Sequence, residues 1–238
     1  MITSLDNKKV KEWTKLHNKK YRDEEYLIYD EKTIIAAFNN NLLKTLIYTE
    51  SPLFEFIDSY EVSKEVMNKI AKKDGVKYLG VAGKIEEKEN YKNRVLLLDD
   101  IQDPINLGRI IELCDAFNFD SLVLSNGTCD MYHEKCIENA KDSIYNVSIK
   151  RCDLKDEIIN LKKKGFLVYA TGLSNNDIEI KGVSESEKMA FILGNEGNGV
   201  SKELFNMSDK IIKIDMNNID SLNVAIAGAI VLNAFSNL

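Results

Sequence analysis

The segment that most constrains this chain is a short apolar run followed at once by a glycine-rich loop. Residues 189–193 read MAFIL and hold no polar side chain, which is typical of a strand buried on both faces. Residues 194–199 then read GNEGNG, with three glycines around the carboxylate of Glu196. Because glycine adopts positive φ and lets backbone approach a ligand closely, the pattern indicates a nucleotide-like ligand at the end of a strand. A side chain added at Gly194 is expected to fill that ligand's space.

A second strand and an apolar helix follow the glycine loop. Residues 210–214 read KIIKI and are predicted to form a strand, and Ser221 is expected to cap the next helix. Residues 224–235 are apolar almost all round, so this helix must be buried against its own domain or a second chain. The polar side chains of Glu196, Ser221 and Asn223 are therefore expected to converge on one pocket.

The spacing of these glycines differs from the common nucleotide-binding motifs. It matches neither G-x-G-x-x-G after the first strand of a βαβ unit nor a P-loop ending in Gly-Lys-Ser/Thr. Paired with IDM…SLNV at residues 214–224, however, LGNEGNG resembles the second and third motifs of the SpoU (TrmH-like) branch of the SPOUT RNA methyltransferases. Those motifs have the form L-G-x-E-G-x-G and I-P-M…S-L-N-V, and Asp215 stands here in place of the proline.

Composition limits the other classes of function. A net charge of −6 argues against coating nucleic acid through bulk electrostatics, so RNA contact would need a local basic patch. The N-terminus lacks the apolar core of a secretory signal, and the longest apolar run is too short to span a bilayer, so we expect a cytoplasmic protein without membrane contact. The four cysteines form no C-x-x-C pair and there are only two histidines, so no metal is expected.

The most basic stretch of the chain lies at its N-terminus. Residues 5–22 read LDNKKVKEWTKLHNKKYR and are predicted to form one helix. Its cations recur at steps of three or four and would share one helix face: Lys8, Lys11, Lys15, Lys19 and Arg22. Such a face is either simply solvated, or it follows the phosphates of RNA and positions the nucleic acid without selecting its sequence. The sequence leaves both hypotheses open.

The first eighty residues alternate between predicted strands and helices. Strands are expected at residues 26–29, 45–48 and 76–82, with helices at 31–38 and 63–71, and this order indicates a small α/β domain. It resembles the RNA substrate-binding domain that often precedes SpoU catalytic domains. Residues 83–93 are charged, without periodicity, and are interpreted as a linker, giving expected domains at 1–88 and 89–238.

The second domain is predicted to be a parallel α/β sheet covered on both faces. Strands are expected at 94–98, 121–124, 166–170, 189–193 and 211–214, and helices at 106–117, 134–143 and 154–164. Ligands bind such sheets at the carboxyl ends of the strands, where the glycine loops lie. The SPOUT resemblance, and not the periodicity, implies a deep trefoil knot near the C-terminus.

Residues 98–118 resemble the family's first motif, in which N-x-G precedes a helix that carries an arginine. Asn106 and Gly108 match, whereas Glu112 holds the position of the arginine. In the family this arginine is thought to help the ribose 2′-hydroxyl lose its proton, and a carboxylate inverts its charge. Arg109 lies one turn earlier on much the same face and is the candidate replacement. Glu138 and Asp142 also hold carboxylates where the family usually has arginine and glycine.

The resemblance implies an RNA 2′-O-ribose methyltransferase that uses S-adenosylmethionine, acts on RNA (ribosomal more than transfer RNA) and forms a homodimer. The expected catalytic residues are Asn106, Arg109, Glu196, Ser221 and Asn223. The expected cofactor-binding residues are Thr171, Gly172, Leu193, Gly194, Asn195, Gly197, Ile214, Met216 and Leu222. Two alternatives remain: an RNA-binding homologue in which Glu112 has weakened or abolished catalysis while the cofactor still binds, and an unrelated α/β nucleotide-binding enzyme. The latter does not explain why GNEGNG and SLNV occur together.

Overall fold

The computed structural model of the chain describes residues 1–55, 57–89, 91–119, 121–174, 177–183, 186–216, 218 and 221–236. The chain divides into two compact units. One consists of residues 1–86 with 130–145, and the other of residues 87–129 with 146–238. Residues 130–145, which sequence reasoning assigned to the second domain, therefore pack within the first unit.

The first unit is built on a sheet with the strand order β1-β4-β2-β3 among the described residues. These strands are β1 (Glu25–Ile28), β2 (Leu43–Tyr48), β3 (Asp58–Glu61) and β4 (Tyr78–Gly83). Both β1 and β2 run antiparallel to β4, and β3 runs parallel to β2. Helices α1 (Lys8–Lys15) and α3 (Lys64–Ala71) share one apolar core with the sheet. Helix α2 (Glu31–Asn39) meets β4 at Gly80, where an added Cβ would lie 3.2 Å from Ile34.

The single helix expected over residues 5–22 is wrong. Helix α1 ends at Lys15, and a separate 3₁₀ turn, η1 (Lys19–Tyr21), begins after Asn18. The Asn18 side chain accepts a hydrogen bond from the Lys20 amide, as an N-cap residue does. The break rotates the chain, so the five cations do not lie along one helix face.

Arg22 consequently has a different environment from the one expected. Its side chain is 5% exposed, and its guanidinium donates to Asp130 and to the carbonyl oxygens of Leu16 and His17. Burial alone would raise the pKa of Asp130, but the hydrogen bonds from Arg22 and the Tyr132 amide outweigh it and lower that pKa. Arg22 is thus a buried structural cation that ties the end of η1 to residue 130.

Segment 130–145 contains α5 (Glu134–Ala140) and η2 (Lys141–Tyr145), and it adds carboxylates to the first unit. Glu138 pairs with Lys73, and Asp142 lies 3.2 Å from the Nζ of Lys32. The two departures from the SpoU pattern in this segment therefore have basic partners within the same unit.

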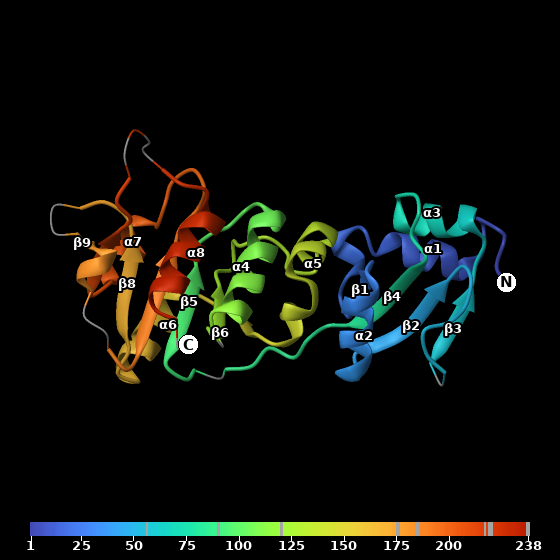
Figure 1. The fold of residues 1–238 in the computed structure, drawn as a ribbon, viewed down its shortest axis with the longest axis horizontal. Helices are drawn as coiled ribbons and strands as arrows, with labels where there is room; N and C mark the ends of the chain where they lie inside the picture. The colour runs from blue at the N-terminus through green and yellow to red at the C-terminus, as the bar shows by residue number, and fades with distance from the viewer. Residues whose placement is uncertain are drawn as a thin grey trace. The chain divides into compact units, whose positions relative to one another are not determined.

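The second unit is built on a sheet whose described strands all run parallel, in the order β7-β6-β5-β10-β8-β11-β9. The strands are β5 (Arg94–Leu98), β6 (Ser121–Leu124), β7 (Ser148–Arg151), β8 (Leu167–Thr171), β9 (Ile178–Glu179), β10 (Met189–Leu193) and β11 (Lys210–Lys213). The all-apolar strand β10 lies between β5 and β8 (Figure 1). Its five residues are all buried. This parallel α/β arrangement confirms the predicted fold class, and the knot stays a prediction.

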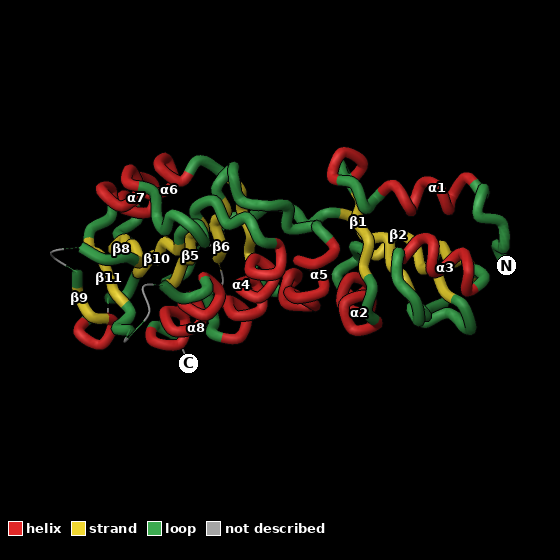
Figure 2. Tube along the Cα trace, turned by 90° about the horizontal axis from the view of Figure 1, so that it is seen from above, coloured by secondary structure: helices red, strands yellow, loops and turns green. Residues whose placement is uncertain are grey.

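Helices cover both faces of this sheet. Figure 2 shows α6 (Leu154–Lys163) and α7 (Lys202–Met207) on one side of the strands, and α4 (Pro104–Ala116) and α8 (Val224–Ala234) on the other. Alternate residues of β5, β10 and β8 pack against α6, and Gly228 of α8 lets that helix approach Leu193 and Ile110. A Cβ at Gly228 would lie 3.1 Å from Leu193 Cδ1.

Some elements were missed or misplaced by the sequence patterns. Strands β3, β7 and β9 and helix α7 were not predicted, and α4 begins at Pro104 rather than Asn106. Asp103 caps α4 by accepting from the Ile105 amide, which suits proline at the first helical position.

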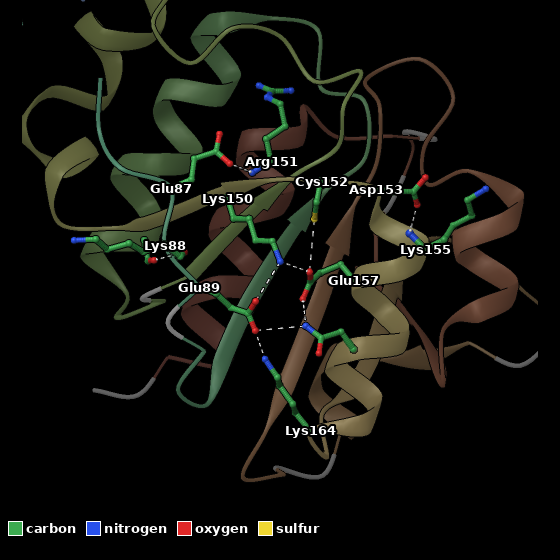
Figure 3. A network of polar contacts seen from close by, with 12 residues as sticks. Glu87, Lys88, Glu89, Lys150, Arg151, Cys152, Asp153, Lys155, Glu157 and Lys164 are labelled. Atoms are coloured by element: carbon green, nitrogen blue, oxygen red, sulfur yellow. Dashed lines mark hydrogen bonds and ion pairs between the residues drawn. The ribbon is translucent and has the colours of Figure 1, made fainter. Parts of the chain in front are cut away.

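The segment interpreted as a linker is hydrogen-bonded to the second unit from Glu87 onward (Figure 3). The Glu87 carboxylate accepts from the backbone amide of Arg151, and the carbonyl oxygen of Lys88 accepts from the Ser148 hydroxyl. The Nζ of Lys150 lies 3.3 Å from Glu89 and 2.7 Å from the buried Glu157. We call residues 87–89 the β7 strap.

No helix among the described residues is long and apolar enough to cross a membrane. The same residues contain no cluster of three or more His, Cys, Asp or Glu side chains suited to a metal ion.

Candidate functional site

A cavity of about 260 Å³ opens at the carboxyl ends of β8, β10 and β11. All nine residues expected to bind the cofactor line it: Thr171, Gly172, Leu193, Gly194, Asn195, Gly197, Ile214, Met216 and Leu222. Glu196 and Ser221 line it as well, whereas Asn106, Arg109 and Asn223 do not. The remaining lining residues were missed, namely Leu173, Gly199, Ile212, Val224 and Ala227. Strand alternation from Ile214 would have found Ile212, and helical spacing from Val224 would have found Ala227.

The glycine loop closes on itself through Asn195. The backbone groups of Asn195 and Gly199 exchange two hydrogen bonds of 3.0 and 2.9 Å. The Asn195 side-chain oxygen accepts from the amides of Gly197 and Asn198, while its amide nitrogen donates to the Asp100 carbonyl. Asn195 therefore holds the loop's shape and fastens it to the loop after β5.

Gly194 is required by the loop's own backbone. A Cβ at this position would lie 2.0 Å from the carbonyl carbon of Gly199 and from the amide nitrogen of Val200. The expectation that a side chain here would fill the ligand's space is thus wrong, because it would collide with the returning limb of the loop. Gly199, with φ of +69°, supplies the left-handed turn that makes this return possible.

A chain of hydrogen bonds links the three motifs. The backbone amides of Gln102 and Asp103 and the side-chain amide of Asn106 all donate to the Glu196 carboxylate, at 3.1 to 3.2 Å. Asn223 in turn donates to the side-chain oxygen of Asn106 at 3.0 Å. The chain brings together the loop after β5, the glycine loop and the start of α8.

These contacts decide the charge state of Glu196. Partial burial alone would raise its pKa, but the hydrogen bonds from Asn106 and the surrounding amides outweigh burial and lower that pKa. Glu196 therefore stays ionised at neutral pH and accepts from three donors of the neighbouring loop. This arrangement suits a carboxylate that fixes the geometry of the loops, and it disfavours a role as a general base.

Helix α8 is capped by Asn223 and not by Ser221. The Asn223 side-chain oxygen accepts from the amides of Ala225 and Ile226, at 2.9 and 3.3 Å. Ser221 lies two residues earlier, is exposed and lines the cavity. The predicted cap is wrong because asparagine, an equally good cap residue, stands nearer to the first helical turn.

Arg109 lies on the exposed side of α4, one turn after Asn106. Helical spacing places residues three apart on neighbouring positions of one face, so Arg109 follows directly from the buried Asn106. Glu112 is half-buried another turn along the same helix. The helix therefore presents Asn106, Arg109 and Glu112 in succession.

The four lysines expected to bind RNA fall into two groups. Lys8 and Lys11 lie near acidic neighbours on the first unit, Glu12 at 3.8 Å and Asp6 at 2.9 Å. Lys15 and Lys19 are exposed, and neither lies within ion-pair distance of a carboxylate in the part of the chain that the structure describes.

Comparisons with known proteins identify similar sequences and structures. Residues 93–233 match the model of the SpoU rRNA Methylase family. The chain is 33% identical over 241 residues to the 23S rRNA (guanosine(2553)-2'-O)-methyltransferase RlmP of Bacillus subtilis, with 97% of each protein covered. A crystal structure of an rRNA methyltransferase from Sinorhizobium meliloti gives a TM-score of 0.89 at 26% identity, over 98% of this chain and 95% of that chain. An AdoMet-bound rRNA methyltransferase structure from the same organism gives 0.86 at 27% identity, with the same coverage.

Proposed function

The chain belongs to the SpoU rRNA methylase family, and on that premise we propose that it transfers a methyl group from S-adenosylmethionine to a ribose 2′-hydroxyl of ribosomal RNA. The observation that carries the proposal is the hydrogen-bonded chain from Glu196 through Asn106 to Asn223, which unites the family's three motifs beside the cavity. The Bacillus subtilis relative is named for 2′-O-methylation of 23S rRNA, which favours ribosomal RNA as the substrate.

The cavity has the chemistry that S-adenosylmethionine requires. Leu193, Ile212, Ile214, Leu222 and Val224 give it apolar walls suited to an adenine ring. The glycine loop offers backbone amide and carbonyl groups at its rim, where side chains would block a ligand's approach. When bound, this cofactor supplies an electrophilic methyl group on a positively charged sulfur.

The chain's own residues then have to position the ribose and favour the charge that develops on its oxygen. Arg109 is the proposed cation for that charge, because a preorganised guanidinium stabilises an alkoxide and a neighbouring phosphate. Glu196 and Asn106 are proposed to act indirectly. Their hydrogen bonds fix the loop after β5, and α4, which carries Arg109, starts from this loop. Ser221 is exposed, lines the cavity and is proposed to contact the ribose.

A homodimer is proposed from the apolar surface beside the cavity. Leu173, which lines the cavity, is 68% exposed, and Ile226 on α8 is 53% exposed. Large apolar side chains are costly to leave in water, and a second copy of the chain could cover both. This assignment agrees with the apolar character of α8 along most of its length.

The alternative of an inactive RNA-binding homologue is less well supported. It rests on Glu112 alone, whereas the relatives that match nearly the whole chain are named as methyltransferases.

The decisive test is transfer of labelled methyl groups from S-adenosylmethionine to ribosomal RNA from a strain that lacks this gene. Modified positions are then mapped by their resistance to alkaline cleavage, because a 2′-O-methyl ribose cannot attack its own phosphate. Label at one alkali-resistant linkage is the expected result. Label confined to a base, or none at all when the cofactor binds, would contradict the proposal.

A further inference from the structure

The first unit contains a hollow of about 480 Å³ that the methyl-transfer site does not use. It lies between the end of α1, the η1 turn, the residue after α3 and the residue before α5. Its rim carries Lys15, Lys19, Tyr21, Lys72 and His133. Three separate segments of the chain thus bring three lysines, an aromatic ring and a histidine to one place.

The hollow carries three lysines that form no close ion pair among the described residues. Lys15, Lys19 and Lys72 are exposed, and none lies within ion-pair distance of a carboxylate among the described residues. By contrast, Arg22 and His17, which lie deeper in the hollow, are matched by Asp130 and Glu134. Asp130 interacts with Lys19 only at longer range, so an anion that enters would meet three ammonium groups without a direct carboxylate partner, in a chain whose net charge is −6.

Tyr21 gives the hollow an accessible aromatic surface. Its side chain is 43% exposed, and the ammonium groups of Lys15 and Lys20 lie 5.6 and 4.8 Å from the centre of its ring. An exposed ring bordered by cations is the arrangement on which proteins stack the bases of single-stranded nucleic acid while lysines hold the phosphates. An arriving base would displace an ammonium group from the ring, and the freed lysine would be within reach of the nucleotide's phosphate.

His133 offers the Nε2 of its ring as a hydrogen-bond donor. Its Nδ1 accepts from the backbone amide of Lys135 at 3.2 Å, so the proton of the neutral ring lies on Nε2. The floor is held in place as well, because Arg22 and His17 hydrogen-bond to the backbone carbonyls of Leu16 and Ile70. A site held in this way loses little entropy when it binds a ligand.

We propose that this hollow binds one unpaired nucleotide of the substrate RNA, with its base stacked on Tyr21 and its phosphate held by Lys15, Lys19 and Lys72. The inference rests on the proposed function insofar as it takes RNA as the ligand. A base inside a duplex has neighbours on both faces, so stacking on Tyr21 selects a loop, bulge or strand end. The hollow would thus distinguish an unpaired nucleotide from a regular duplex. Contacts with phosphates alone cannot make this distinction.

The test compares binding of a fluorescent single-stranded 12-nucleotide oligouridylate with binding of a 12-base-pair RNA duplex to the full chain. Tyr21→Ala should weaken single-strand binding about tenfold, within the range that loss of one stacked base gives, and leave duplex binding unchanged. Tyr21→Phe keeps the ring and should bind as wild type does. Equal single-strand affinity for Tyr21→Ala and wild type, or equal loss for both RNAs, would overturn the proposal.

A matched pair of double variants tests the lysines. Lys15→Gln with Lys19→Gln should reduce the log-log salt slope of oligouridylate binding by about 1.4, as expected for two lost phosphate contacts on a single strand. Lys8→Gln with Lys11→Gln removes the same charge from the paired lysines of α1 and should change the slope much less. Equal changes in the two double variants would show that only general charge matters, and the hollow would lose its role.

Failure of this inference is separable from failure of the proposed function. Cofactor binding and methyl transfer are measured on the same variants. If wild type transfers no methyl group but Tyr21→Ala still loses oligouridylate affinity, the nucleotide site stands and the proposed activity falls. If methyl transfer proceeds and Tyr21→Ala changes neither its KM for RNA nor the oligouridylate affinity, the nucleotide site falls alone.

Discussion

The side-chain amide of Asn223 donates a 3.0 Å hydrogen bond to the side-chain oxygen of Asn106, and this joins the first turn of α8 to the first turn of α4. The other contacts of Asn223 determine which atom donates in this bond. The oxygen of Asn223 already accepts from Ala225 and Ile226, so only its nitrogen can face Asn106. The nitrogen of Asn106 must then face Glu196, and neither amide can be turned round without breaking two contacts.

Asn106→Asp should damage the site in a way that depends on pH. It replaces the donor to Glu196 by a second carboxylate about 3.1 Å away, and two such groups share one proton because both cannot ionise together. We expect methyl transfer to fall about 100-fold at pH 8, the cost of a misplaced loop, and to recover partly at pH 5.5, where a shared proton restores the hydrogen bond. Initial rates at the two pH values measure this effect.

Asn233→Asp makes the same chemical change at an exposed position of α8 and serves as the control. It should leave the ratio of the rates at pH 8 and pH 5.5 as in wild type. An Asn106→Asp variant with the wild-type ratio would show that the bond to Glu196 does not matter for activity.

Filling the cavity and breaking the glycine loop should be distinguishable. Ala227→Phe places a ring in the cavity from α8 and should weaken S-adenosylmethionine binding at least 100-fold from an expected micromolar Kd, about −8 kcal/mol, with little change in Tm. Gly194→Ala should lower both affinity and Tm, because its Cβ meets loop backbone at 2.0 Å. Calorimetry and thermal unfolding measure the two effects.

Gly182→Ala is the matched glycine control, since its Cβ would lie 3.6 Å from Ile178 in ordinary contact. It should change neither quantity appreciably. Undiminished cofactor affinity in Ala227→Phe would remove this cavity as the cofactor site.

Arg109→Ala should lower the rate of methyl transfer 10²- to 10³-fold while cofactor affinity stays within a few fold, as expected when a charged donor acts mainly in the transition state. Arg109→Lys keeps the charge without the planar fork and should recover only part of the rate. Glu112→Arg should maintain or raise the rate, because it restores a cation at the family's position. If Arg109→Ala transfers methyl groups as fast as wild type, Arg109 does not stabilise the ribose oxygen, and Glu112 becomes the candidate catalytic residue.

Asp130→Asn should destabilise the first unit by about 3 kcal/mol at pH 7, because it leaves Arg22 buried without its counter-charge. The lowered pKa of Asp130 fixes the sign of the pH dependence. The ion pair stabilises the fold above the unfolded carboxyl pKa of about 3.9 and stops doing so as pH falls through the lower folded value. Urea unfolding should therefore separate variant and wild type at pH 7 and bring them together in strong acid.

Asp6→Asn is the control for this change. Asp6 pairs with Lys11 on the solvated surface of the same unit, where ion pairs contribute little to stability. No measurable difference from wild type is expected. Equal stability of Asp130→Asn and wild type at pH 7 would show that the two carbonyl contacts of Arg22 suffice.

The elements that sequence reasoning found are those with strong apolar periodicity. The strands at 94–98 and 189–193 are buried on both faces, and their continuous apolar runs indicated this burial directly. The missed strands β3 and β7 read DSYE and SIKR, and polar edge segments of four residues carry little pattern. Their pairing is decided by the neighbouring strand, which local sequence cannot reveal.

The cavity lining was predictable because the resemblance supplied motifs, and the exceptions are informative. Asn223 was expected at the pocket and Asn106 among the catalytic residues, but neither lines the cavity, and the two side chains are hydrogen-bonded to each other beside it. Arg22 was expected on an RNA-facing helix, yet its partner Asp130 lies 108 residues further along the chain. Charge periodicity within one helix cannot show such a partner.

The β7 strap has a consequence for self-association. Strand β7 is the outermost strand of its sheet, and an outermost strand can pair with a strand of another molecule and seed aggregates. Glu87 occupies the amide of Arg151, and Lys88 and Glu89 lie beside the same strand. In the full chain, Glu87→Ala with Glu89→Ala removes the side-chain contacts of the strap with β7 and should increase aggregation, whereas the wild-type chain should stay monodisperse. A charged stretch that composition marks as a linker thus covers part of the exposed edge of the sheet.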